Sequence, residues 1–335
     1  MEQPFVSVVV LTYNQKDTVA RTLDSILAQK CSYDFEILIG DDASTDGTVE
    51  VLDYYAKRYD NVKVFVQPEN VGVTKNAYDL LMKTTGKYIA SCEGDDFWCD
   101  ENKLQKQVDF LENHPEYVGC SHDVNFVNEY GKVYYKNNPT WISLKRDYSY
   151  KDFKGVYLPG QSCSIVRRNI YLDKEKDFSL IYTASKYIGD RTTVLLCLPY
   201  GKFYRMKERM SCYSFSFAKD TQGITFQKFV NSKSSFCEEW EYTKKLEEYT
   251  KNNFEFSVNF RPYKHSLFFS SIVACFRRRK CKNQAVRPKD ILASDTNKLG
   301  YVVALPVWFA IKLARKIKLF VIKKKYFASM RKERA

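Results

Sequence analysis

Hydrophobic and polar positions along the first half of the chain predict strands that alternate with helices. Residues 6–11 form a short apolar run typical of a buried strand, and apolar residues then recur at helical spacing from Thr18. The same order continues, with strands expected at 35–40, 62–66 and 87–92 and helices expected at 48–59 and 74–83. This alternation predicts an α/β fold with a mostly parallel, doubly wound sheet.

Beyond residue 100 the alternation weakens, and antiparallel additions to the sheet are expected. Asp46 and Asp100 stand where they would cap the helices at 48–59 and 101–113. The later elements are expected as an antiparallel strand pair at 118–127 and 132–135, a loop at 137–160, a strand at 162–166, a helix at 190–198 and a strand at 202–206. From about residue 227 the pattern becomes helical, first charged and then apolar and basic.

Length and charge divide the chain into two regions. Its 335 residues are enough for one large domain with an appendage. We place the domain at 1–225, in halves 1–125 and 126–225, and a helical basic extension at 226–335. The net charge is +13, but residues 312–335 hold ten Lys or Arg and one Glu, so nine of these charges belong to the tail.

Cysteine usage indicates a reducing compartment. The ten cysteines are scattered singly, without a CxxC pair or a Cys and His set at zinc spacing. The start of the chain lacks the basic and small-residue features of a signal peptide. We therefore expect a cytoplasmic protein whose cysteines are reduced and mostly buried.

Polar and acidic residues gather where three of the predicted parallel strands end. They are Thr12, Tyr13 and Asn14 after the first strand, Asp41 and Asp42 after the second, and Glu93, Asp95 and Asp96 after the fourth. Ligands bind outside the carboxyl ends of such strands, and neighbouring carboxylates favour a divalent cation between them. Helix capping is the alternative role for Asp95 and Asp96, and turn hydrogen bonding or capping is the alternative for Asp41 and Asp46.

Five segments in order resemble a known family. They are VSVVVLTYN at 6–14, DDASTDGT at 41–48, NVGVTKN at 70–76, GKYIASCEGDDFW at 86–98 and KLQKQVDFL at 103–111. Together they resemble the inverting family 2 glycosyltransferases of GT-A fold, closely over the first 125 residues and more loosely to Ser214. The domain at 1–225 would then be catalytic, with a nucleotide-sugar binding half followed by an acceptor half.

This resemblance implies a sugar transfer from a nucleotide-diphosphate donor, with a UDP-sugar favoured and Mn²⁺ or Mg²⁺ as cofactor. Asp95 and Asp96 would hold the metal, Asp96 as the more direct ligand, while Asp95 and Glu93 would face the ribose or the donor sugar. The nucleoside would contact Thr12, Tyr13, Asn14 and Asp42. Lys75 would lie near the donor, and an ordinary exposed helix lysine is its alternative role.

A second acidic motif is expected to supply the catalytic base. Asp190, within the segment 187–191, resembles that motif, although Gly189 stands where the family usually has another acid. It would accept the proton of the acceptor hydroxyl during direct, inverting attack; its alternative is a helix N-cap. The three histidines His114, His122 and His265 form no cluster and are expected to pack or to lie on the surface.

The acceptor is expected to be a glycan or a lipid-linked saccharide in surface polysaccharide synthesis. The Q-x-x-R-W motif of processive synthases is absent from the sequence, which favours addition of a single sugar. Arg205 and Arg209 lie in the part of the chain where those synthases carry the motif. They would either approach phosphate or form a basic face of a strand.

The tail pattern predicts an interfacial helix on an anionic membrane. Phe309, Leu313, Ile317 and Phe320 share one helical face, and Lys312, Arg315, Lys316 and Lys323 gather on the other. A helix docked on its own domain is the alternative. The apolar run 299–311 is too short to span a bilayer, and the basic cluster 277–280 would add a second contact, which places the protein at the inner face of the cell membrane.

Two other functions compete with sugar transfer. A nucleotidyltransferase acting on sugar phosphates would need a glycine-rich basic loop near the N-terminus, and the sequence has none there. A nucleic-acid-binding protein would spread its charge over aromatic strands, whereas this charge lies in an apolar-faced tail. We therefore expect no nucleic-acid partner.

Overall fold

The structure is a computed structural model of the chain, and it describes residues 4–139, 141–155, 157–217, 235–276, 292 and 299–333. The chain divides into two compact units. The first unit holds residues 1–150 and 158–215, and the second holds residues 151–157 and 216–335.

The first unit is built on a mixed sheet of ten strands within the described residues. The strands are β1 (Val6–Thr12), β2 (Phe35–Asp41), β3 (Val62–Val66), β4 (Tyr88–Glu93), β5 (Phe97–Trp98), β6 (Tyr117–Val127), β7 (Val133–Tyr135), β8 (Asp147–Tyr148), β9 (Val166–Arg168) and β10 (Lys202–Ser214). Their order is β3-β2-β1-β4-β9-β6-β10-β5, with β7 paired to β6 and β8 to β10. Neighbours among β1 to β4 pair in parallel, and β5, β7, β8 and β9 add antiparallel pairs. The predicted α/β fold with antiparallel additions is confirmed.

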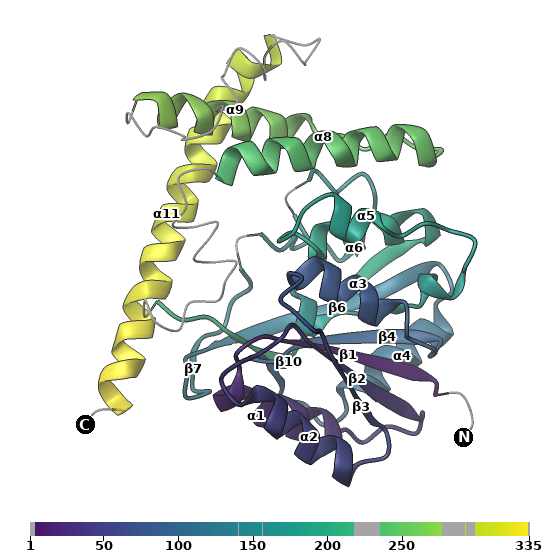
Figure 1. Cartoon of the computed structure of the whole chain (residues 1–335). Helices are drawn as coiled ribbons and strands as arrows, with labels where there is room; N and C mark the ends of the chain where they lie inside the picture. Colours follow the sequence, from purple (N-terminus) through teal and green to yellow (C-terminus); the bar gives the residue numbers. More distant parts are fainter. Residues whose placement is uncertain are drawn as a thin grey trace. The chain divides into compact units, whose positions relative to one another are not determined.

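Helices cover both faces of the parallel part of this sheet. They are α1 (Lys16–Leu27), α2 (Thr48–Arg58), α3 (Val73–Leu81), α4 (Lys103–Asn113), α5 (Leu180–Thr183) and α6 (Asp190–Cys197), with short 3-10 helices η1 (Ser162–Ser164), η2 (Ile170–Leu172) and η3 (Leu198–Tyr200). Helix α1 connects β1 to β2 and α2 connects β2 to β3, and these strands follow one another toward one edge of the sheet. Helix α3 connects β3 to β4, which lies on the other side of β1. Because such connections are right-handed, α3 lies on the opposite face of the sheet from α1 and α2 (Figure 1). The strand order reverses between β1 and β4, which is where such folds bind ligands.

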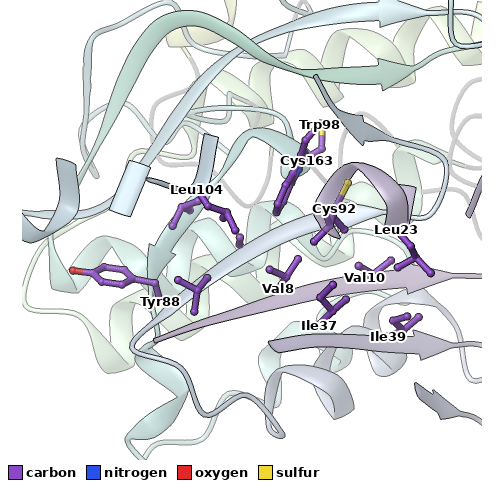
Figure 2. Close-up of a cluster of buried hydrophobic side chains, with 14 of the residues drawn as sticks. Val8, Val10, Leu23, Ile37, Ile39, Tyr88, Cys92, Trp98, Leu104 and Cys163 are labelled. Carbon is purple, nitrogen blue, oxygen red and sulfur yellow. The ribbon is translucent and has the colours of Figure 1, made fainter. Parts of the chain in front are cut away.

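The main hydrophobic core lies on the face of the sheet covered by α1 and α2 (Figure 2). Val8 and Val10 of β1 both enter this core because alternate residues of a strand point to the same side. Leu23 of α1 and Leu104 of α4 are buried in the same cluster. The packed core fixes β1, β2 and β4 side by side, so the groups at their carboxyl ends are held on a rigid base.

The N-caps of two helices differ from the prediction. Gly47, with a φ of 95°, precedes α2 in a left-handed conformation that favours glycine, and Asp46 lies one residue further back, where it accepts a hydrogen bond from the Thr48 N–H. Asn102 precedes α4, and Asp100 accepts a 2.9 Å hydrogen bond from the Asn102 N–H. Both acids therefore stabilise the approach to a helix without occupying its N-cap.

The prediction of a strand at 162–166 is wrong. The chain forms the 3-10 turn η1, closed by a 2.8 Å hydrogen bond from the Ser164 N–H to the Gln161 carbonyl, and the strand β9 begins only at Val166. The turn is stabilised by a side-chain contact, because Ser162 Oγ donates a 2.9 Å hydrogen bond to Glu93 Oε1. The predicted antiparallel pair is confirmed as β6 and β7.

The second unit is helical in its described residues, with α8 (Ser235–Asn253), α9 (Arg261–Phe276) and α11 (Leu299–Glu333). Helix α9 contacts both α8 and α11. A small core of Trp240, Tyr263, Leu267, Phe269 and Tyr301 joins the three helices. Within the described part of the chain, no helix is long and apolar enough to cross a membrane. The basic cluster at 277–280 lies outside the described residues.

Candidate active site

Three acidic residues lie at the end of β4 and in the tight turn that follows it. Glu93 ends the strand, and the Asp96 N–H donates a 2.9 Å hydrogen bond to its carbonyl. Gly94 lies between them, and a Cβ at this position would stand 2.3 Å from Gln15 Oε1. Because glycine has no Cβ, the acidic turn can approach the loop that follows β1. The two loops thus meet beside the reversal of strand order, where ligands bind.

Asp96 has one engaged and one unpaired carboxylate oxygen. Its side chain is fully buried, and Oδ1 accepts a 2.8 Å hydrogen bond from the Ser214 N–H at the end of β10. Oδ2 is also buried and has no partner with hydrogen-bond geometry among the described residues, although the nearby Cys163 thiol interacts with the carboxylate and lowers its pKa. A buried carboxylate oxygen without a partner is costly, so this atom marks a place where a ligand would stabilise the site.

Burial raises the pKa of all three carboxyl groups, and neighbouring negative charges add to the rise for Glu93 and Asp96. Burial, followed by the charge of Asp95, raises the pKa of Glu93 to about 7 although Ser162 donates to it. Burial also raises the pKa of Asp95, and burial with the neighbouring Asp95 and Glu93 charges raises that of Asp96 well above its usual range. Glu93 and Asp95 remain partly exposed. A cation would relieve this repulsion.

The structure adds residues that sequence patterns did not indicate. Arg21 of α1 directs a guanidinium N–H to the Asp95 carbonyl at 3.4 Å and stacks 4.6 Å from the centre of the Phe97 ring. Its positive charge opposes the rise in the pKa of Asp95. Ser162 of η1 donates to Glu93, and the Ser214 N–H of β10 donates to Asp96. No local sequence signal marks these residues, because each is recruited by tertiary structure.

The loops after β1 and β2 hold each other together. Thr12 is buried, and its Oγ1 donates a 2.8 Å hydrogen bond to Asp41 Oδ2. Asn14, in a left-handed conformation with φ of 52°, accepts from the Thr45 N–H at 2.9 Å, and its own N–H donates to Ser44 Oγ at 2.8 Å. Tyr13 lies between these two residues and is partly exposed.

Asp42 anchors the segment that leads into α3. Its Oδ1 accepts from the Val71 N–H at 2.8 Å and its Oδ2 from the Gly72 N–H at 3.0 Å. Burial raises the pKa of Asp42, and these two backbone hydrogen bonds oppose the rise. Asp41 accepts from Ser44 as well as Thr12, which matches its alternative role in turn hydrogen bonding.

Lys75 lies on α3 among side chains of the same region. Its Nζ forms an ion pair with Asp79 and stands 5.6 and 5.3 Å from the ring centres of Tyr78 and Tyr182. The structure therefore shows Lys75 engaged with its own helix and with Tyr182, and it shows no contact between Lys75 and the acidic turn.

Asp190 is the first residue of α6 and is exposed. Gly189 occupies the N-cap position, so the alternative assignment of Asp190 as N-cap is wrong. The charge of Asp190 makes a small contribution to the raised pKa of Glu93, so the two carboxylates interact electrostatically although 97 positions separate them in the numbering. Thr74 Oγ1 donates a 2.8 Å hydrogen bond to the Ser185 carbonyl and ties the segment before α6 to α3.

The other charged candidates have structural partners. Arg205 donates to Asp123 Oδ1 through Nε at 2.8 Å and through a terminal nitrogen at 2.6 Å, and Arg209 lies 3.7 Å from Asp123 Oδ2. His122 is buried, and burial lowers its pKa to about 3. His114 stacks on Phe110, and His265 packs edge-on against Tyr301 in the second unit.

Comparison with known proteins identifies similar sequences. The model described as glycosyl transferase family 2 matches residues 7–173. An uncharacterized protein of Mycobacterium tuberculosis is 40% identical over 144 residues, which are 43% of this chain and 41% of that protein. The putative teichuronic acid biosynthesis glycosyltransferase TuaG of Bacillus subtilis is 36% identical over 109 residues, which are 32% of this chain and 42% of that protein. The chain thus spans less than half the length of these curated relatives.

A solved structure shares the fold over nearly the whole chain. The mannosyltransferase PcManGT from Pyrobaculum calidifontis, in complex with GDP-Man and Mn²⁺, matches with a TM-score of 0.53 and 15% identity. The match covers 98% of this chain and 88% of that one.

Proposed function

Because this chain belongs to glycosyl transferase family 2 through residues 7–173, we propose that it transfers a sugar from a nucleotide-diphosphate donor to a hydroxyl of a saccharide acceptor. The observation that supports this most is the unpaired, buried Oδ2 of Asp96 beside the carboxylates of Asp95 and Glu93. These groups lie at the carboxyl ends of parallel strands, at the reversal of strand order where ligands bind.

Asp95 and Asp96 would hold Mn²⁺ or Mg²⁺. A bound cation neutralises the charge that develops on the diphosphate leaving group. Among the described residues no three His, Cys, Asp or Glu side chains form a metal-binding group. The two carboxylates suit an ion that takes its other ligands from the diphosphate and water, as Mg²⁺ prefers. Asp95 is partly exposed, whereas access to Asp96 Oδ2 requires the atoms that cover it to shift.

Asp190 would remove the proton from the acceptor hydroxyl. Its carboxylate is exposed at the head of α6, and its charge acts on Glu93 of the acidic turn, which supports a place beside the donor site. A base in this position would allow the hydroxyl to attack the anomeric carbon directly, and direct attack inverts the configuration.

The nucleoside would lie against the loops after β1 and β2. Tyr13 and Asn14 are accessible there, while Thr12 is buried against Asp41 and supports the loop. Each oxygen of Asp42 accepts one backbone N–H and keeps one further acceptor site, which suits the N3–H of a uracil and hence a UDP-sugar donor. Lys75 would act near the donor only after leaving Asp79.

The acceptor would be a glycan or a lipid-linked saccharide of surface polysaccharide, extended by one sugar at a time. The family membership and the name of the similar Bacillus protein, which refers to teichuronic acid biosynthesis, support this acceptor class. Addition of a single sugar rests on the missing Q-x-x-R-W motif.

The C-terminal helix would bind the anionic inner face of the cell membrane. Phe309, Leu313, Ile317 and Phe320 of α11 are 58%, 61%, 57% and 59% exposed. Tyr301, Ile322 and Tyr326 of the same helix are buried; Tyr301 belongs to the core shared with α8 and α9, and Tyr326 packs against Phe217 of the same unit. The helix therefore docks on its own unit through one set of residues and keeps an apolar stripe exposed among basic residues, which is the composition of an interfacial helix.

A donor panel tests the proposed activity. The full chain is incubated with UDP-, GDP- and dTDP-sugars, and nucleoside diphosphate release and thermal shift are followed with and without Mn²⁺. We expect one nucleotide class to stabilise the protein in a Mn²⁺-dependent way that excess chelator reverses. Stabilisation by none of these donors, or equal stabilisation after chelation, would contradict the proposal.

A further inference from the structure

Two cysteines meet at the short strand that follows the acidic turn. Strand β5 pairs antiparallel with β10, with Trp98 opposite Ser211 and Phe97 opposite Cys212. The Cys99 N–H extends this pairing by donating a 2.9 Å hydrogen bond to the Met210 carbonyl. Cys99 and Cys212 are therefore diagonal neighbours on adjacent strands.

The two cysteines share a third side chain, Asn125 of β6. Asn125 stands opposite Cys212 in the parallel pairing of β6 with β10, and its Nδ2 donates to Cys99 Sγ at 3.8 Å. Cys99 Sγ also donates to the Arg209 carbonyl at 3.6 Å. The neighbouring Cys212 thiol and Asn125 lower the pKa of Cys99 and burial opposes this, whereas the neighbouring Cys99 thiol and burial raise the pKa of Cys212. Of the two thiols, Cys99 therefore loses its proton more readily.

Access to solvent distinguishes Cys99 from the other cysteines whose burial the structure describes. Cys99 is exposed and Cys31 is partly exposed, whereas the remaining five are buried: Cys92, Cys120, Cys163, Cys197 and Cys212. An oxidant in solution can therefore reach Cys99, whose diagonal neighbour on β10 is the buried Cys212.

We propose that Cys99 and Cys212 form an oxidation site that takes a peroxide and closes to a disulfide. The Cys99 thiolate attacks hydrogen peroxide, and cleavage of the O–O bond gives a sulfenic acid and hydroxide. The Cys212 sulfur then attacks the sulfenic sulfur and expels the second oxygen. Two thiols and one peroxide thus become one disulfide and two water molecules, with the thiol protons transferred to the departing oxygens.

The disulfide would act on the acidic site, an inference that rests on the proposed function. Cys99 lies three residues after Asp96, and Cys212 lies two residues before Ser214, which donates to Asp96 Oδ1. Side chains diagonal across two antiparallel strands usually have Cβ atoms farther apart than a disulfide allows. Closing the bond therefore pulls β5 and β10 together and shifts the two segments that hold Asp96.

A mapping experiment tests the disulfide independently of any enzymatic activity. The full chain is treated with hydrogen peroxide, unfolded in guanidinium chloride that contains N-ethylmaleimide so that buried free thiols are also blocked, and digested with trypsin without reduction. Cys99 lies in the peptide 88–103 and Cys212 in the peptide 210–219. We expect these two peptides to be joined, with Cys92 of the first carrying the blocking group, and the link to disappear after dithiothreitol. Absence of the joined peptide, or a link through Cys92, would overturn the site.

Activity measurements test the consequence. Oxidation should lower Mn²⁺-dependent donor turnover by about 10- to 100-fold, the cost of a small misplacement of a reacting group, and dithiothreitol should restore it. Cys99→Ser should lose this sensitivity, while the matched variant Cys31→Ser should keep it. If turnover is unchanged in oxidised protein that carries the mapped disulfide, the proposal that the disulfide acts on the acidic site is overturned. Lack of turnover even in the reduced protein would instead contradict the proposed function, and the mapped disulfide would stand.

Discussion

The backbone N–H of Ser214 donates a 2.8 Å hydrogen bond to Oδ1 of Asp96 across 118 residues of sequence. The end of β10 thus satisfies one oxygen of a fully buried carboxylate and leaves Oδ2 without a partner among the described residues. The acidic turn after β4 is therefore completed by the later half of the first unit, and the site depends on both halves being folded.

Removal of that N–H should weaken the site. We predict that Ser214→Pro lowers the free energy of unfolding by about 1–3 kcal/mol, because a buried carboxylate oxygen loses its donor. Metal-dependent donor binding should fall with it. Ser214→Ala is the matched control, since it keeps the N–H and removes only the hydroxyl that donates to the Asp95 carbonyl. Urea denaturation and donor titration measure both effects, and equal donor binding by the two variants would contradict the role of the N–H.

Asp190 should be needed for transfer and not for donor binding. We predict that Asp190→Asn lowers transfer by about 10² or more while the affinity for the donor is kept, because the amide cannot accept the acceptor proton. Single-turnover rates and donor titration separate the two quantities. Asp177→Asn, another acid near the start of a helix and close to α5, is the control. A transfer rate near that of the wild type would leave Asp190 a structural role only.

The buried His122 should make the fold sensitive to acid. Its pKa is lowered by burial to about 3 in the folded state, against an ordinary value near 6.5. Between these values the unfolded chain binds a proton that the folded chain excludes, so the stability contributed by neutral His122 is present above about pH 6.5 and is lost as the pH falls.

His122→Asn tests this effect because asparagine can still donate to the Asp123 carbonyl that His122 Nδ1 contacts at 2.8 Å. Between pH 7 and pH 5 the wild type should lose about 2 kcal/mol more unfolding free energy than the variant, at roughly 1.4 kcal/mol per pH unit. The same pH dependence in both proteins would show that His122 does not remain neutral in the fold.

The sequence was sufficient for the parts of the site that follow strand order. Thr12, Asp42 and Glu93 were placed at one edge because a buried run followed by polar residues marks the carboxyl end of a parallel strand, and β1, β2 and β4 pair as that pattern predicts. Hydrophobic periodicity and the alternation of strands and helices are local signals, so they can be recognised in the sequence without knowledge of the tertiary structure.

The remaining parts depend on contacts between distant segments. The turn at Ser162 was predicted as a strand because its apolar neighbours resemble one, and only the structure shows the hydrogen bond to Glu93. The sequence predicts the start of α2 at Thr48 correctly but assigns its N-cap to Asp46, because the left-handed conformation of Gly47 has no signal in the hydrophobic pattern. The sequence does not indicate Arg21, because a single arginine on an amphipathic helix does not differ in pattern from an ordinary surface arginine.

The apolar stripe of α11 should direct membrane binding. We predict that replacing Phe309, Leu313, Ile317 and Phe320 with Ser abolishes most binding to vesicles of phosphatidylglycerol and phosphatidylcholine, because each buried apolar side chain contributes about 1.5–3 kcal/mol. These residues are exposed, so the fold should be kept. Ser substitutions at Tyr54 and Leu144, exposed in the first unit, serve as the control. Vesicle co-sedimentation equal to that of the wild type would contradict an interfacial role for this stripe.

The most direct test of the metal-assisted transfer is donor turnover by Asp96→Asn in the presence of Mn²⁺. The amide keeps an oxygen for the Ser214 N–H and removes the negative charge, so the fold should persist while the cation loses its ligand. Asp53→Asn, an exposed carboxylate on α2, is the matched control. We predict that Asp96→Asn loses Mn²⁺-dependent release of nucleoside diphosphate and that Asp53→Asn retains it. Release by Asp96→Asn at the rate of the wild type would contradict the assignment of the site.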